Sequence, residues 1–258
     1  MRRRLLTLTL LGFALVAAAP APAEVQQSGN LRVGFGGGFT PSSLPRDRLA
    51  PVAVRIQGHI TTTDGSHPPP LQQLELALNR HGRLSTRGLP TCRAAALQST
   101  STEGALARCR GALVGHGKFH TSFQFGPGST VPSDGAVLAF NSRRAGRPAL
   151  LMHLSISVPV RVTFVLPMRI GHDAKGDFGT ILRARIPRLA GGLGSITAIK
   201  LEIGRRYSFR GERRSYLSAS CGAPAGFPAA VFPFLRGSFI FEDSRRIRTT
   251  LIRNCRVR

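Results

Sequence analysis

Apolar and polar residues alternate in short runs along most of the chain. The alternation is clearest in the segments 52–57, 74–79, 199–203 and 238–241. In the first of these, Val52, Val54 and Ile56 would share one face of an extended chain, with Ala53 and Arg55 on the other. A period of two is typical of strands that bury one face. These segments therefore predict half-buried β-strands.

Further short apolar runs predict additional strands at 31–35, 119–125, 136–141, 149–157, 160–168, 181–186, 216–221 and 248–252. Clusters of Gly, Pro, Asp and Ser separate them, for example at 64–70, 126–135 and 171–176. Many short strands with turn signals between them indicate two packed antiparallel sheets. We therefore expect an all-β fold with β-sandwich architecture.

One segment departs from this pattern. Residues 91–112 are rich in alanine and poor in β-branched apolar residues. Thr102 precedes Glu103 and an Ala-Leu-Ala run, which suits the start of a helical turn. The segment predicts one or two short helices inserted near 92–110 and clamped at both ends by Cys92 and Cys109.

The two halves of the chain share a faint similarity. Residues 74–80 resemble 201–205, and each segment is followed by a Gly-Arg turn, a cysteine and later a Phe-containing strand. This pattern suggests two related β-lobes, 24–145 and 146–258, joined near 143–147. The alternative is that any two β-rich halves look alike at this level, because a repeat this long is weak evidence.

The first residues predict export from the cytoplasm. Arg2, Arg3 and Arg4 precede an uncharged apolar run at 5–19, and Ala21-Pro22-Ala23 follows. This is the layout of a secretory signal peptide cleaved after Ala23. The alternative, a retained anchor, needs ~20 apolar residues, and this run is shorter. Because no later apolar run is long enough to span a bilayer, we expect an extracellular or envelope-associated chain without a transmembrane anchor.

Four cysteines remain after this segment: Cys92, Cys109, Cys221 and Cys255. An even number of cysteines in an exported chain indicates two disulfides. Three pairings exist, and we favour Cys92–Cys109 with Cys221–Cys255 because each bond then stays within one half of the chain. The chain has no C-x-x-C pair, and no histidine lies at ligand spacing from a cysteine. A zinc site is therefore not indicated, and neither a metal nor a cofactor is expected.

The chain is strongly basic. It carries 36 Lys and Arg residues against 12 Asp and Glu, and only Lys118, Lys175 and Lys200 are lysines. Such a charge attracts anionic polymers and membrane surfaces. A GC-rich codon bias would also produce this excess of arginine. No specific nucleic-acid motif is present, and the sequence does not determine the oligomeric state.

No familiar catalytic motif is present. Both the G-x-S-x-G and the H-E-x-x-H pattern are absent. Residues 111–118 (GALVGHGK) fail as a phosphate loop because the glycine spacing is too long and Phe119 replaces the Ser or Thr. His116 and His120 would lie ~13 Å apart on a strand, too far to share a metal. His153 lies in an apolar run and is interpreted as a core residue.

Two clusters remain as candidate sites. Five arginines surround Tyr207 and Phe209, and they are Arg205, Arg206, Arg210, Arg213 and Arg214. They suit anion binding. If the last strands pair, the same basic face could also include Arg245, Arg246, Arg248, Arg253, Arg256 and Arg258. The alternative is a solvated hairpin tip. The second cluster, His172 with Asp173 and Asp177, could serve a hydrolase, although aspartates are also common in turns.

The cysteine-centred segments 89–93, 107–110 and 113–117 resemble a group of uncharacterised exported bacterial proteins, as do 216–221 and 254–256. The resemblance covers most of the chain after residue 23. It implies a disulfide-bonded fold, with no assigned activity and no catalytic residue.

The leading hypothesis is an exported, non-enzymatic structural or binding protein at the cell envelope that contacts an anionic polymer or membrane surface through its arginines. One alternative is a secreted hydrolase of unfamiliar type. The other is a carrier of an apolar ligand held between two β-layers, which requires a large apolar cavity. The sequence alone does not identify the ligand or the biological role.

Overall fold

The computed structural model describes residues 23–126, 128–156 and 161–258. The expected signal peptide, apart from Ala23, lies outside this range, as do the ends of the predicted strands at residues 157 and 160. In the described part of the chain, no helix is both long and apolar enough to cross a membrane.

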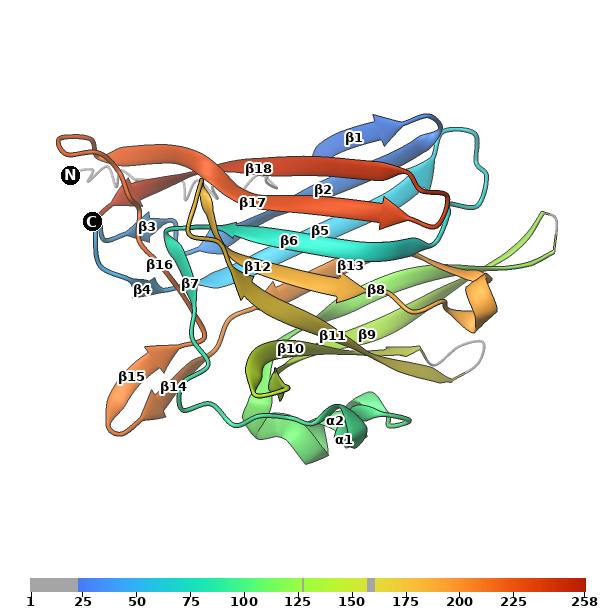
Figure 1. The fold of residues 1–258 in the computed structure, drawn as a ribbon, viewed down its shortest axis with the longest axis horizontal. Coiled ribbons are helices and arrows are strands. Elements are labelled where there is room, and N and C mark those ends of the chain that lie inside the picture. Colours follow the sequence, from blue (N-terminus) through green and yellow to red (C-terminus); the bar gives the residue numbers. More distant parts are fainter. Residues whose placement is uncertain (1–22, 127, 157–160) are drawn as a thin grey trace, which may run out of the picture.

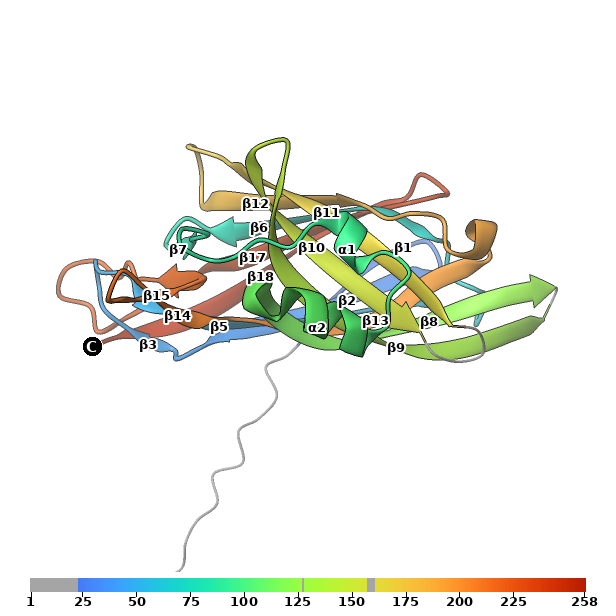
Figure 2. The same cartoon turned by 90° about the horizontal axis from the view of Figure 1, so that it is seen from below.

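The described strands form one large sheet that folds over into two facing layers (Figure 1, Figure 2). In spatial order, the first layer contains β1 (Glu24–Ser28), β2 (Leu31–Thr40), β5 (Ala53–Thr62), β13 (Gly194–Ile203), β8 (Leu113–Gly126) and β9 (Ser129–Arg144). The second contains β10 (Arg147–Ile156), β11 (Val162–His172), β12 (Phe178–Arg185), β6 (Leu71–Asn79), β17 (Ala229–Phe241), β18 (Arg246–Val257) and the short parallel β3 (Ser43–Leu44). The all-β prediction is confirmed. Burial alternates as expected in 52–57, 199–203 and 238–241, whereas in 74–79 Ala77 and Asn79 are buried as well.

The core lies between the two layers and is built from their inward-facing apolar side chains. Phe35 of β2 meets Phe239 of β17 edge to face, with ring centroids 5.6 Å apart. Phe119 of β8 meets Phe164 of β11 in the same way at 6.0 Å. Edge-to-face pairs add to the stabilisation that burial alone provides. The layers are therefore held together by direct packing along the sandwich.

Arginine side chains link the layers along the open edge, where β1 and β2 approach β18. Arg245 donates to the carbonyl oxygen of Ser28 at 3.1 Å and to the side-chain oxygen of Asn30 at 2.7 Å. Arg253 of β18 donates through Nε to the carbonyl oxygen of Gly37 at 2.7 Å. These bonds satisfy backbone acceptors where the two sheet edges meet without pairing, which explains part of the arginine content near the C-terminus.

The expected division into lobes 24–145 and 146–258 is not how the strands are arranged. β13, from the second half, lies between β5 and β8, while β6, from the first half, lies between β12 and β17. The boundary expected near 143–147 falls in the turn between β9 and β10, which are hydrogen-bonded neighbours. The halves interleave because each supplies strands to both layers, so neither could bury its apolar face alone.

The predicted helical insert is confirmed. α1 (Ala94–Leu97), α2 (Thr102–Cys109) and the 3-10 turn η1 (Arg110–Ala112) cover the outer side of β9 and β10. The N-cap of α2 is Ser101, one residue before the expected Thr102, and its hydroxyl accepts the N–H of Gly104 at 3.1 Å. Because the insert covers one face and the core the other, β10 is buried at every position from 149 to 156.

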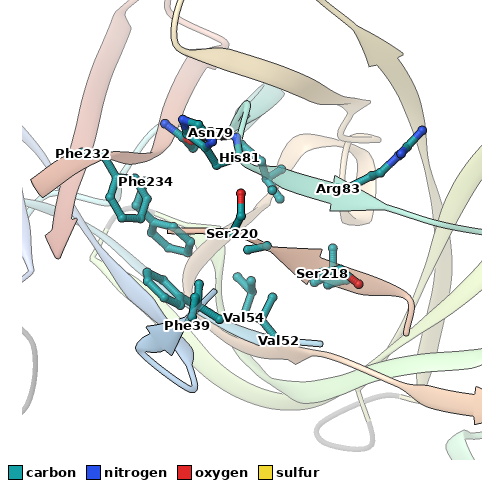
Figure 3. A pocket seen from close by; sticks show the side chains of 15 residues that line it. Phe39, Val52, Val54, Asn79, His81, Arg83, Ser218, Ser220, Phe232 and Phe234 are labelled. Carbon is teal, nitrogen blue, oxygen red and sulfur yellow. Dashed lines mark hydrogen bonds between the residues drawn. The ribbon is translucent and has the colours of Figure 1, made fainter. Parts of the chain in front are cut away.

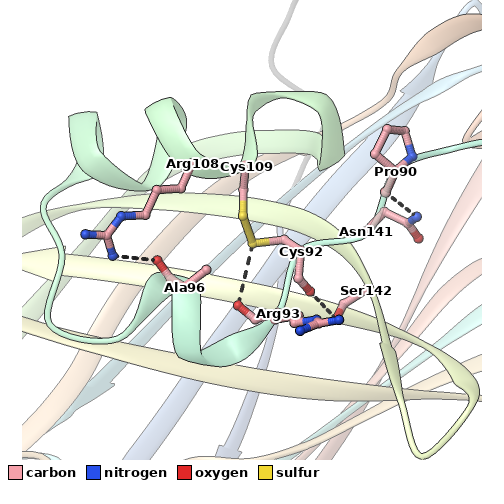
Figure 4. The surroundings of a disulfide bond; sticks show 8 residues. All are labelled: Pro90, Cys92, Arg93, Ala96, Arg108, Cys109, Asn141 and Ser142. Atoms are coloured by element: carbon pink, nitrogen blue, oxygen red, sulfur yellow. Dashed lines mark hydrogen bonds between the residues drawn. A yellow bond between two sulfur atoms is a disulfide. The ribbon is translucent and has the colours of Figure 1, made fainter.

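The Cys92–Cys109 disulfide closes the insert, as expected from the sequence. Figure 4 shows how the neighbouring chain is tied to the sheet, because Ser142 donates to the carbonyl oxygen of Cys92 at 2.7 Å and Asn141 donates to that of Pro90 at 2.9 Å. The second expected bond, Cys221–Cys255, is also present. Both pairings favoured from the sequence are confirmed.

The remaining small elements lie outside the main sheet. β4 (Ala50–Pro51), β16 (Leu217–Ala219) and β7 (Gly82–Leu84) form a three-stranded sheet, and the predicted strand at 216–221 shortens to β16. β14 (Arg206–Phe209) and β15 (Glu212–Ser215) form a separate two-stranded hairpin, and η2 (Ala190–Gly192) precedes β13. Figure 1 shows this hairpin projecting from the sandwich on the side away from β17 and β18.

Candidate functional site

An apolar cavity of about 90 Å³ lies between the layers, with Phe35, Met152 and Leu166 among its lining residues. Preformed ligand pockets are typically ~300 Å³ or larger. A cavity this small and apolar is an ordinary packing defect of a large core. It gives the apolar-carrier hypothesis no support.

A second pocket, of about 30 Å³, lies between the small three-stranded sheet and the main sheet. Figure 3 shows Phe39, Phe232 and Phe234 gathered at one side of it. Of its polar residues, Asn79 is engaged, since its amide donates to the carbonyl oxygen of Pro233 and its side-chain oxygen accepts the N–H of His81, both at 2.9 Å. The pocket has room for little more than a water molecule, and the hydrogen bonds of Asn79 hold the fold together.

Two of the five arginines predicted to bind anions have structural roles in the hairpin. Arg205 donates to the carbonyl oxygens of Arg110, Gly111 and Leu113 at 2.7–3.1 Å, which ties the hairpin to the end of the helical insert. Arg214 pairs with Glu212 at 2.5 Å and lies 5.8 Å from the ring centre of Phe209. Their charges are therefore engaged within the fold.

The other three arginines are exposed to solvent. Arg206 and Arg213 lie on the hairpin face that carries Ser208, and Arg210 is at the tip, where its guanidinium lies 5.4 Å from the Phe209 ring. The opposite hairpin face packs on the body, since the hydroxyl of Tyr207 donates to the carbonyl oxygen of Arg87 at 2.7 Å. The hairpin thus presents three cations to solvent.

A larger basic surface covers the outer side of the second layer. Cross-strand partners share a face, and one row runs through Arg248 (β18), Ser238 (β17), Glu75 (β6), Arg183 (β12) and Arg169 (β11). Arg246, Arg236 and Arg185 lie two residues away on their strands and so project from the same side. We call this set the arginine face: Arg169, Arg183, Arg185, Arg236, Arg246 and Arg248.

Glu75 is the acid within the arginine face. It accepts from Arg183 Nε at 2.7 Å and lies 4.0 Å from Arg236, whose guanidinium also stacks 4.5 Å over the Phe178 ring. The guanidinium groups of four exposed arginines of the face form no ion pair or hydrogen bond with any described residue: Arg169, Arg185, Arg246 and Arg248. Because neighbouring strands are ~4.8 Å apart, the row from β11 to β18 spans about 19 Å.

Sequence reasoning named only Arg246 and Arg248 of this face and grouped them with the hairpin. They lie instead on the same outer face of the second layer as arginines from β11, β12 and β17. A sequence signal existed, because Arg183 and Arg185 alternate with apolar residues, as do Arg246 and Arg248. Strand order was needed to see that these alternations meet.

The candidate hydrolase residues do not form a catalytic pair. His172, Asp173 and Asp177 are all exposed at the turn between β11 and β12. A side-chain oxygen of Asp173 accepts the N–H of Lys175 at 3.0 Å, which is a common role for aspartate in turns. This arrangement gives the hydrolase hypothesis no support.

Metal-ligating side chains do not gather in the described residues, where no group of three or more His, Cys, Asp or Glu could hold an ion. His116 and His120 lie on the exposed side of β8, as expected for a strand. The Nδ1 of His120 is instead hydrogen-bonded to a side-chain oxygen of Asp134 on the neighbouring β9.

His153 is a core residue, as interpreted from the sequence. It is fully buried on β10 beneath the helical insert, and its Nε2 lies 3.0 Å from the carbonyl oxygen of Thr100. The hydroxyl of Thr163 donates to the same carbonyl at 3.0 Å. Burial lowers the pKa of His153 below its ordinary value of 6.5, because the charged form loses its hydration.

The stability of the protein is therefore expected to fall as the pH drops below about 6.5. In that range the unfolded chain takes up a proton at His153 that the folded chain does not, with a slope of up to ~1.4 kcal/mol per pH unit. In His153→Leu this contribution should disappear, while Thr163 still donates to the Thr100 carbonyl. Urea unfolding between pH 8 and pH 5 measures the effect, and an unchanged pH profile in the variant would contradict it.

No known family model, curated protein or solved structure matches the chain. The resemblance to uncharacterised exported bacterial proteins therefore stays a prediction, and the inference of function depends on the geometry above.

Proposed function

We propose that this is an exported, non-enzymatic binding protein that attaches to phosphate- or carboxylate-bearing components of the cell envelope through the arginine face. The observation that carries the proposal is the row of arginines across β18, β17, β6, β12 and β11, in which Glu75 is the acid. Guanidinium groups pair with phosphate and carboxylate in a fork geometry. The remaining charge is available to an external anion.

The shape of the face suits an extended partner. Its arginines project from one side of a sheet at the spacing of strands, and they are spread over about 19 Å. Such an array matches many separate negative charges on a polymer or surface better than one enclosed small molecule. The two disulfides support the exported location, because such bonds persist in oxidising compartments.

The test is retention of the purified protein on envelopes from the cells that produce it, measured across a salt series. Wild type should be retained at low salt and released as salt rises, because counterions compete for the contacts. Near an anionic surface each basic residue contributes ~1 kcal/mol to the free energy of binding. The variant Arg169/Arg185/Arg246/Arg248→Ser should therefore lose about 4 kcal/mol of binding free energy, roughly a thousandfold in affinity.

A hairpin variant, Arg206/Arg210/Arg213→Ser, serves as the control, since it removes exposed charges from another part of the molecule. It should keep most of the retention. Loss of retention in the hairpin variant alone would assign binding to the hairpin, while equal behaviour of both variants and wild type would reject arginine-mediated attachment. Circular dichroism of each variant verifies that the fold is intact.

A further inference from the structure

The outer side of the first layer places two lysines directly opposite each other. Lys118 of β8 and Lys200 of β13 are register partners in an antiparallel pair. Directly opposed residues have Cβ atoms about 5 Å apart, and like charges there are destabilising. The repulsion between the two ammonium groups therefore destabilises the fold unless a negatively charged group lies between them.

The neighbouring side chains do not neutralise the pair. Glu202, two residues from Lys200 on the same face, is bonded to Arg55 at 2.7 Å. Among the described residues, neither lysine has an ion-pair or hydrogen-bond partner. The position opposite Lys200 on β5 is Gln57, and the position opposite Lys118 on β9 is Ala136. Asp134, two residues from Ala136 on β9, is bonded to His120. The neighbouring carboxylates Glu202 and Asp134 are thus already engaged.

The two lysines border an open groove of about 590 Å³. Arg55, Gln57, His116 and the Arg55-bonded Glu202 line it with them, as does Gly38 of β2. A Cβ at Gly38 would meet only the Nε of Arg253, at 4.0 Å, so this position leaves the groove open, while Phe39 and Thr40 of the same strand contribute to its lining. The groove size falls in the range of ligand sites, about 300–1,000 Å³.

The residue type is itself informative. Arginine is the ordinary base of this chain, and the three lysines are rare among 36 basic residues. Two of the three meet here. An ammonium group is a compact point charge with three donors on a flexible stem, which suits a small anion approached from two sides. A guanidinium fork would present a wider, planar surface.

We infer that this lysine groove, defined by Lys118, Lys200, Arg55, Gln57 and His116, binds a phosphate group between the two ammonium groups. A phosphate carries up to two negative charges, which matches the two lysines, and its oxygens accept several charge-assisted hydrogen bonds. The Gln57 amide and the His116 ring offer further donors. The site lies on the opposite layer from the arginine face and is independent of it.

The small number of lysines allows a site-specific measurement on the intact protein. Reductive methylation with ¹³C-formaldehyde labels the lysines and the terminal amine while keeping their charge. We expect inorganic phosphate to shift the methyl signals of Lys118 and Lys200 in a saturable manner. Lys175, which is exposed on the β11–β12 turn, serves as the internal control and should not move. Sodium chloride at the same ionic strength should not reproduce the shifts.

Variants and a second probe complete the test. Lys200→Ala should weaken phosphate binding at Lys118 about tenfold or more, because one charged donor is lost, whereas the Ser variant of the arginine face should bind as wild type. Phosphatidylglycerol vesicles present the same group as an ester, and a response to vesicles alone would identify a lipid headgroup as its source. Equal shifts of the methyl signals at all three lysines, or no shift with either probe, would overturn the proposed phosphate site. Neither outcome would affect the proposal for the arginine face.

Discussion

Replacing Cys221 and Cys255 with alanine is expected to lower the free energy of unfolding by about 4 kcal/mol. The bond joins residues 34 apart, and in the chain-entropy model a loop of this length gives a stabilisation between ~3 and ~4.7 kcal/mol. Both sulfurs are buried, with the cysteines at most 2% exposed. Urea or guanidinium unfolding of the variant and the wild type measures the difference.

The location of this bond makes the effect global. Cys255 is near the end of β18, whose outer neighbour is only the two-residue β3. The disulfide therefore anchors a strand near the edge of the sheet, where β18 also approaches β1 and β2. Loss of the anchor should loosen the closure of the sandwich as well as enlarge the unfolded ensemble.

The bond in the insert provides the matched control. The double variant Cys92→Ala/Cys109→Ala breaks a disulfide between residues 17 apart. For a loop of this length the same model gives a stabilisation of ~3 kcal/mol. Because that loop holds only the helices over β9 and β10, its loss should affect the insert more than the sheet. The prediction would be contradicted if the Cys221/Cys255 variant were as stable as wild type. It would also be contradicted if this variant lost less free energy of unfolding than the insert variant.

Gly117→Ala is expected to destabilise the protein by ~3 kcal/mol, at the upper end of the usual cost of overpacking. A Cβ at this position would lie 1.9 Å from the carbonyl oxygen of Lys200 and 2.9 Å from the Cα of Leu201. Both atoms are backbone, so the clash cannot be relieved by a side-chain rotation. β8 and β13 would have to separate, which breaks ladder hydrogen bonds in the middle of the first layer.

The same exchange at Gly126, at the end of the same strand, is the control. A Cβ there would meet nothing within 4 Å, so Gly126→Ala should be neutral or slightly stabilising, because alanine restricts the unfolded chain. Thermal unfolding followed by circular dichroism compares the two variants. If they melt at the same temperature, the close approach of β8 and β13 is not as described.

Two glycines near the start of β8, Gly115 and Gly117, show how far a local sequence pattern reaches. The ladder between β8 and β9 shifts register between Leu113 and Gly115. The reason Gly117 must lack a side chain, however, is the backbone of β13, which comes from a segment about 80 residues later. A local pattern could mark the glycine but could not reveal this neighbour.

The candidate surfaces show the same limit. The hairpin arginines were found as a cluster because they are close in sequence, yet Arg205 and Arg214 are engaged within the fold. The arginine face and the opposed lysines combine residues that are far apart in the chain. Their alternation within single strands is visible in the sequence, whereas the register that aligns them across strands is not.

The sequence by itself determined the all-β composition, the positions of most strands, the helical insert and the favoured cysteine pairing. These depend on local periodicity, turn residues and short separations, which act within a few residues. The tertiary structure alone decided that the two halves interleave in one folded sheet and that Arg183 lies beside Arg169 and Lys118 opposite Lys200. Strand pairing depends on how all apolar faces are buried at once, and no single segment contains that information.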